Sequence, residues 1–172
     1  VDILNFLKEK RKNNNFDSYK IIDVGGSHSS WSSKYVNAIT DFFDPKYKDT
    51  KIKVFKLDLM DVDSWNELLV YVKKNGKFDF SICSHTLEDV CHPKLLVNLL
   101  EMVSKEGYIE VPSKHQEFNR FDTYYGKKIR GYLHHRYIYD IIDNKLVAFP
   151  KVSFLESSHF DSIENNDNLK KG

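Results

Sequence analysis

Short apolar runs alternate with amphipathic stretches through the first two thirds of the chain. Short runs bounded by polar turns are typical of buried strands, whereas an apolar residue at every third or fourth position predicts a helix. The pattern predicts five strands, at residues 19–24, 38–43, 51–56, 78–84 and 108–111. An opening amphipathic helix has Ile3, Leu4, Phe6 and Leu7 as its apolar residues.

Further helices are predicted between these strands. One begins at about Ser30, a second ends at Gly76, and a third begins at Pro93 and ends at Gly107, because glycine favours helix ends and proline favours the first helical turn. Strands that alternate with helices indicate an α/β fold. We therefore predict a Rossmann-like, mostly parallel sheet with helices on both faces.

The pattern changes after Pro112. A polar, aromatic loop runs to about Gly131, and two strand-like runs, residues 132–142 and 146–154, then flank a short turn. This arrangement predicts a C-terminal antiparallel β-hairpin on the edge of the parallel sheet. We expect one domain over residues 1–172, with a polar tail at 161–172; this domain could also be part of a longer protein.

Composition and charge indicate which kinds of binding partner and which cellular setting the sequence favours. Lys and Arg total 26 against 25 for Asp and Glu, so the net charge of +1 gives no electrostatic argument for nucleic acid or membrane. No apolar run is long enough to span a membrane. The only two cysteines, Cys83 and Cys91, favour a reducing, cytoplasmic setting over a disulfide scaffold.

A glycine pair follows the first predicted strand. In residues 23–27 (Asp-Val-Gly-Gly-Ser), Gly25 and Gly26 would let the backbone approach a ligand closely, and a helix starting near Ser30 would favour a carboxylate. A glycine pair after a strand is equally common in an ordinary turn. This pair alone therefore leaves both interpretations open.

Two acids at later strand ends favour a ligand site. Asp44 follows the second strand, where a carboxylate can accept hydrogen bonds from both hydroxyls of a ribose. Asp58 follows the third strand, where a carboxylate can accept from an adenine amino group. The carboxyl ends of neighbouring parallel strands line one crevice, which predicts an adenosine pocket. Asp41 is the alternative to Asp44, which we prefer because it lies beyond Phe42 and Phe43.

Taken in this order, the residues resemble a small class I S-adenosylmethionine-dependent methyltransferase whose fourth strand ends in a Ser-His-x-Leu-Glu segment. The resemblance covers about residues 18–112 and rests on 22–27, on 57–58, on 78–93 and on 107–112. The usual Gly-x-Gly-x-Gly turn is reduced here to a single glycine pair. The resemblance implies that the methionine part of the cofactor contacts Asp23, Gly25, Gly26 and Ser27. It also implies that the ribose contacts Asp44, that the adenine contacts Asp58 and Leu59, and that Ser84 and His85 lie beneath the cofactor.

The methyl acceptor is expected near the ends of the fourth and fifth strands. Methyl transfer needs a positioned acceptor, and an alcohol acceptor also benefits from a general base or from a metal ion that lowers the acceptor's pKa. His85 is the best-placed candidate, although a histidine at a strand end can also bond only to the backbone. Further catalytic candidates are His134 and His135, and acceptor-binding candidates are Glu88, His115 and Arg136.

No metal site is expected. In a strand, His134 and His135 would point to opposite faces and could not share one ion without a bulge. The spacing of Cys83, Cys91 and their neighbouring histidines matches no standard zinc pattern.

The sequence thus predicts an S-adenosylmethionine-dependent methyltransferase that modifies an oxygen or nitrogen of a small polar acceptor, a sugar or nucleotide-linked sugar. The alternative is a methyltransferase-like module without activity, which binds partners within a larger protein. A nicotinamide-dependent oxidoreductase is disfavoured, because the chain lacks the Gly-x-Gly-x-x-Gly turn and ends in a hairpin.

Overall fold

The computed structural model describes residues 2–15, 17–42, 51–119, 122–124 and 127–152. The chain divides into two compact units, Val1–Glu110 and Val111–Gly172. Whether these two units fold together as the expected single domain over residues 1–172 is not tested by this division, so the single domain stays a prediction. The polar tail at 161–172 lies outside the described residues.

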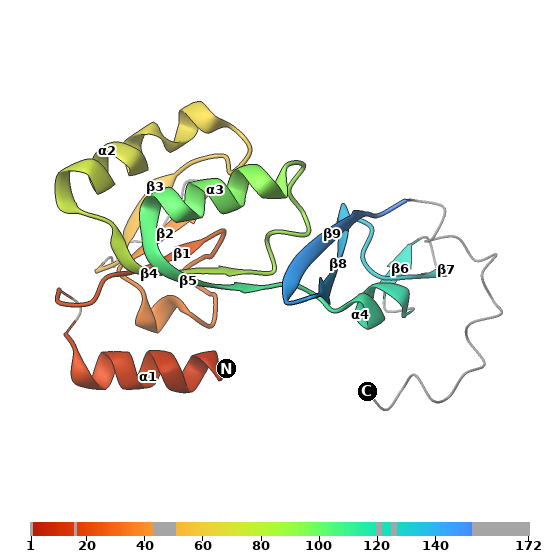
Figure 1. Cartoon of the computed structure of the whole chain (residues 1–172), viewed down its shortest axis with the longest axis horizontal. Coiled ribbons are helices and arrows are strands. Elements are labelled where there is room, and N and C mark those ends of the chain that lie inside the picture. Colours follow the sequence, from red (N-terminus) through yellow and green to blue (C-terminus); the bar gives the residue numbers. More distant parts are fainter. Residues whose placement is uncertain (1, 16, 43–50, 120–121, 125–126, 153–172) are drawn as a thin grey trace. The chain divides into compact units, whose positions relative to one another are not determined.

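A five-stranded sheet forms the centre of the first unit (Figure 1). Its strand order is β3-β2-β1-β4-β5, and every neighbouring pair is parallel. All five predicted strands are therefore present, and the Rossmann-like α/β fold is confirmed. The strands are β1 (Ile21–Val24), β2 (Ala38–Asp41), β3 (Lys53–Lys56), β4 (Phe78–Ser84) and β5 (Ser104–Glu110).

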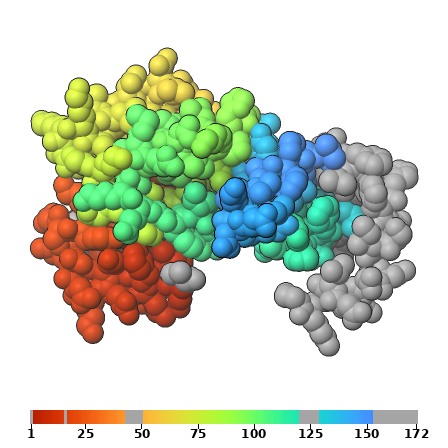
Figure 2. Space-filling model, in the orientation of Figure 1, coloured from red at the N-terminus to blue at the C-terminus, as the bar shows by residue number. Residues whose placement is uncertain are grey.

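Helices cover both faces of this sheet (Figure 1). On one face, Leu7 of α1 (Ile3–Asn13) belongs to a buried cluster with Ile21, Ile39 and Ile82. On the other lie α2 (Asn66–Asn75), which follows the 3-10 turn η2 (Val62–Trp65), and α3 (Pro93–Val103). In the space-filling view the red surface of α1 and the yellow and green surfaces of α2 and α3 lie on opposite sides of the unit (Figure 2). None of the helices in the described ranges has the length and apolar character needed to cross a membrane.

One predicted helix and one predicted helix end are wrong. The segment after β1 contains only a 3-10 turn, η1 (Ser33–Tyr35), in place of the helix expected from Ser30. Serine hydroxyls there bond to nearby groups, as when Ser30 Oγ donates to Ser27 O at 2.5 Å, and such bonds compete with helix formation. Gly107 lies inside β5; an added Cβ would lie 2.5 Å from Ser81 Oγ, so close packing against β4 explains this glycine.

The second unit contains the predicted hairpin. Strands β8 (Tyr137–Ile142) and β9 (Lys145–Pro150) pair antiparallel, and the turn residues Asp143 and Asn144 both have positive φ, as a two-residue hairpin turn requires. The hairpin is a two-stranded sheet of its own, so its expected place on the edge of the parallel sheet is wrong. The region expected to be a loop contains α4 (Lys114–Phe118), β6 (Asp122–Tyr124) and β7 (Lys127–Ile129).

Candidate functional site

A cavity of about 350 Å³ opens at the carboxyl ends of the strands in the first unit. Its volume is in the range of small-molecule sites, about 300–1,000 Å³. The strand order reverses between β1 and β4, and open α/β sheets bind ligands at such a switch point. Five residues predicted from the sequence line the cavity, namely Gly25, Gly26, Asp58, Leu59 and His85.

The glycine turn has a close-packed backbone. Gly25 has a φ of 82° and donates its N–H to Thr40 Oγ1 at 2.9 Å. A Cβ at Gly25 would lie 2.5 Å from Thr86 Oγ1, and one at Gly26 would lie 2.1 Å from Asp23 Oδ2. The turn is therefore held by side chains of neighbouring strands. The expected helix N-terminus near Ser30 is absent from this part of the structure, so the argument that it would favour a carboxylate no longer holds.

Two carboxylates from adjacent strands line the same cavity. β2 ends at Asp41, which lines the cavity, whereas Asp44 lies outside the described residues. Asp58 follows β3, and its Oδ1 accepts the N–H of Met60 at 2.8 Å. Ser64 Oγ donates to the carbonyl of Asp58 at 2.7 Å and so fixes this loop. The strand-end argument that favoured Asp44 therefore applies to Asp41.

Among the described residues, three of those predicted to bind the cofactor are not part of the cavity lining. Asp23 is buried and accepts hydrogen bonds from Ser32 Oγ and, at 3.4 Å, from Ser30 Oγ. Ser27 Oγ bonds to Ser29 Oγ, and Ser84 Oγ donates to Glu110 Oε2 at 2.7 Å. These side chains form hydrogen bonds within the turn after β1 and at the end of β4, outside the cavity lining.

The buried carboxyl of Asp23 should make stability depend on pH. Burial raises its pKa above the ordinary 3.8, against the two serine hydrogen bonds that lower it. The folded chain then holds this proton more tightly than the unfolded chain does, so the contribution of Asp23 to stability is fully present below pH 3.8 and is lost as pH rises through its folded-state pKa. Urea unfolding should show Asp23→Asn gaining stability relative to the wild type from about pH 4 upward.

Asp17→Asn, at an exposed position, is the matched control for this titration. Its stability relative to the wild type should stay constant over the same pH range. A constant difference for Asp23→Asn as well would contradict the prediction.

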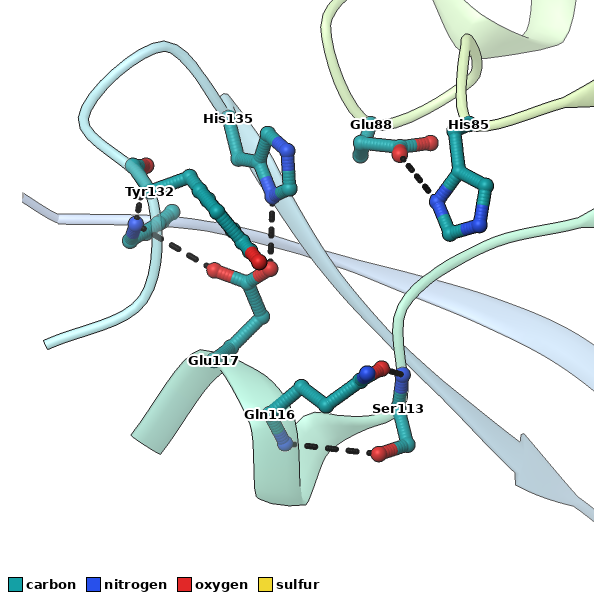
Figure 3. A network of polar contacts seen from close by, with 8 residues as sticks. His85, Glu88, Ser113, Gln116, Glu117, Tyr132 and His135 are labelled. Atoms are coloured by element: carbon teal, nitrogen blue, oxygen red, sulfur yellow. Dashed lines mark hydrogen bonds and ion pairs between the residues drawn. The ribbon is translucent and has the colours of Figure 1, made fainter. Parts of the chain in front are cut away.

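His85 has an unusual backbone at the mouth of the cavity. Its φ of 50° is left-handed, a conformation that non-glycine residues adopt at a cost and that clusters at functional sites. Its N–H donates to Glu110 O at 3.0 Å, and its ring Nδ1 lies 3.5 Å from Glu88 Oε1 (Figure 3). Its side chain is 57 % exposed, so it can meet a ligand.

Glu88 was expected to contact the acceptor, but its side chain is only 1 % exposed. It is therefore a buried neighbour of His85 and not an exposed contact for the acceptor. Asp89, its neighbour, lines the cavity together with Thr40 and Thr86. Sequence reasoning did not predict these two threonines. The sequence shows only that they lie at the ends of predicted strands next to residues that it did predict.

The remaining candidates belong to the second unit. His115 and Arg136 are exposed. The strand expected from residue 132 begins only at Tyr137, so His134 and His135 precede it, and the argument that a strand would point them to opposite faces does not apply. His135 is buried, and its Nδ1 lies 2.6 Å from Glu117 Oε1 (Figure 3).

The two cysteines have different surroundings. Cys83 is fully buried in β4, and this burial raises the pKa of its thiol to about 12, with further contributions from Asp23 and Glu88. Metal ligation and nucleophilic attack require the thiolate, so Cys83 is a packing residue. Cys91 is exposed, and both thiols are free of disulfides.

Comparison with protein-family models, with curated proteins and with solved structures finds no match for this chain. The resemblance to class I methyltransferases therefore depends on the residues quoted above. The cavity adds a geometric argument to it, because residues far apart in the sequence meet there.

Proposed function

We propose that this chain binds S-adenosylmethionine in the cavity of the first unit and transfers its methyl group to a small polar acceptor. The observation that carries the proposal is that Asp41 and Asp58, from adjacent strands, line one cavity with the glycine turn Gly25-Gly26. Adenosine recognition needs carboxylates at such strand ends and a backbone free of side chains beside them.

The lining residues fit the parts of this cofactor. Asp41 would accept hydrogen bonds from the ribose hydroxyls, which is the role that the sequence analysis gave to Asp44. Asp58 would accept from the adenine amino group, with Leu59 and Met60 against the ring. Gly25 and Gly26 would present their backbone to the methionine part. When bound, the cofactor supplies an electrophilic methyl group on a positively charged sulfur.

The chain's own residues would position the acceptor and take its proton. His85 is the candidate base, because it is exposed at the cavity and its Nδ1 lies 3.5 Å from Glu88 Oε1. We propose a sugar or nucleotide-linked sugar as acceptor and a cytoplasmic setting without a nucleic-acid partner, which the balanced charge and the absence of a disulfide between Cys83 and Cys91 support. Catalytic roles for His134 and His135 stay predictions.

Calorimetric titration with S-adenosylmethionine and S-adenosylhomocysteine tests the cofactor. We expect saturable binding of both by the wild type. In Asp58→Asn the amide oxygen can still accept from Met60 N–H, but the charge is gone. Because a hydrogen bond to a charged group contributes about 1.5–3 kcal/mol, binding should weaken by about 10- to 100-fold.

Asp63→Asn is the matched control, because Asp63 is an exposed acid close by in the sequence and outside the cavity lining. It should bind both compounds as the wild type does. A folded wild type that binds neither compound would refute the proposal. Binding without turnover on a panel of sugars and nucleotide sugars would favour the module without activity.

A further inference from the structure

Two histidines of the second unit lie next to each other in a turn. His134 and His135 precede β8, and His135 N–H donates to Tyr132 O at 3.2 Å. Their ring centroids are 4.6 Å apart, and a ligand nitrogen of one lies within 4.8 Å of a ligand nitrogen of the other. The sequence analysis argued against a shared metal ion because neighbouring residues of a strand point to opposite faces. Since the two histidines lie in a turn, that argument does not apply.

A buried carboxylate fixes the ring of His135. Glu117 Oε1 lies 2.6 Å from His135 Nδ1, and the Glu117 side chain is 1 % exposed (Figure 3). With Nδ1 engaged in this bond, Nε2 is the ring nitrogen that a metal would use. Metal-ligating histidines almost always bond through their other nitrogen to a carboxylate, carbonyl or water, which orients the ring and raises its basicity.

Glu117 is itself held from two sides. Lys151 Nζ lies 3.3 Å from Glu117 Oε2 and donates to Tyr132 O at 2.6 Å. Gly131 has a φ of 59°, and a Cβ there would lie 2.4 Å from Glu117 Oε2, so the backbone itself closes over the carboxylate. These contacts fix the Glu117 carboxylate in place, and with it the His135 ring to which it bonds.

We propose that His134 and His135 bind a divalent transition-metal ion, Zn²⁺ in the first place, with Glu117 as the positioning residue of His135. Imidazole is a preferred ligand of zinc, copper and nickel. Two nitrogens on one tetrahedral zinc ion lie about 3.3 Å apart, a spacing that rotation of the exposed His134 side chain can reach. Water completes the coordination. The site belongs to the second unit and does not depend on the proposed cofactor.

Calorimetric titration of the chelator-treated full chain with zinc chloride tests this site. We expect saturable binding of one ion by the wild type and its loss in His134→Ala, an exposed position where folding should be unaffected. Glu117→Gln keeps the shape of the side chain but removes the charge that orients His135. Glu117→Gln should weaken zinc binding by about 10- to 100-fold, the usual effect of replacing a residue that bonds to a metal-ligating histidine.

His92→Ala is the matched control, because His92 is an exposed histidine of the first unit. It should bind zinc as the wild type does, and circular dichroism should show every variant folded. Absence of saturable binding by the wild type, or equal affinity in His134→Ala, would overturn the proposal. If Glu117→Gln fails to fold, His134→Ala alone decides the outcome.

Discussion

Trp65→Ala is expected to lower the free energy of unfolding by about 3–5 kcal/mol, the usual cost of truncating a buried tryptophan. Trp65 ends η2 and has no exposed surface. It follows the loop in which Ser64 fixes Asp58, so the cavity there should loosen as well. Urea unfolding followed by circular dichroism measures the change without relying on tryptophan fluorescence.

Trp65→Phe should cost less than Trp65→Ala. The indole N–H of Trp65 is buried and has no hydrogen-bond partner within the described ranges, so phenylalanine removes an unsatisfied donor and keeps an aromatic ring. Trp31→Ala, at a side chain that is 38 % exposed, should stay within about 0.5 kcal/mol of the wild type. Equal losses at Trp31 and Trp65 would contradict the assigned packing.

Gly26→Ala is expected to destabilise the first unit by about 3 kcal/mol, near the upper end for overpacking. The new methyl group would lie 2.1 Å from Asp23 Oδ2. That carboxyl is buried and bonded to Ser32 and Ser30, so it cannot move aside without losing its partners. Urea unfolding measures the cost, and calorimetry should show weaker binding of S-adenosylhomocysteine, because Gly26 lines the cavity.

Gly76→Ala separates crowding from backbone strain. Gly76 has a positive φ, of 80°, which Gly26 does not have, and an added Cβ at Gly76 meets no atom within 4 Å. Gly76→Ala should cost only the strain of a backbone conformation that is almost restricted to glycine, with φ 80° and ψ 164°, about 1–3 kcal/mol. The double variant Asp23→Ala/Gly26→Ala should recover part of the loss, since contacting residues are not additive. Additive losses would show that Asp23 is not what Gly26→Ala collides with.

The regular elements of the first unit could be predicted because their patterns are local. The apolar run of β4 gave its bounds, residues 78–84, and Pro93 gave the first residue of α3. The helix expected from Ser30 was wrong because serine side chains bonded to Asp23 and to neighbouring backbone. Gly107 was wrongly assigned to a helix end. The reason for a glycine at this position is its close contact with Ser81 on another strand, which the local sequence pattern does not show.

The candidate site was predictable only in part for the same reason. The sequence placed Gly25, Gly26, Asp58 and His85 at strand ends, and parallel pairing brings such ends together. It could not show that Asp23 turns inward, because that orientation depends on Ser30 and Ser32. Likewise, the bond between Glu117 and His135 joins α4 to a distant turn that no local pattern indicates.

The central position of β1 affects the chain while it is being synthesised. β1 pairs with β2 on one edge and with β4 on the other, and β4 leaves the ribosome only after β2, β3 and α2. Until then one edge of an apolar strand is open, and open strand edges promote aggregation. A nascent chain that stops before Phe78 already contains Gly26 and Asp58, but it lacks the strand that completes the sheet around them.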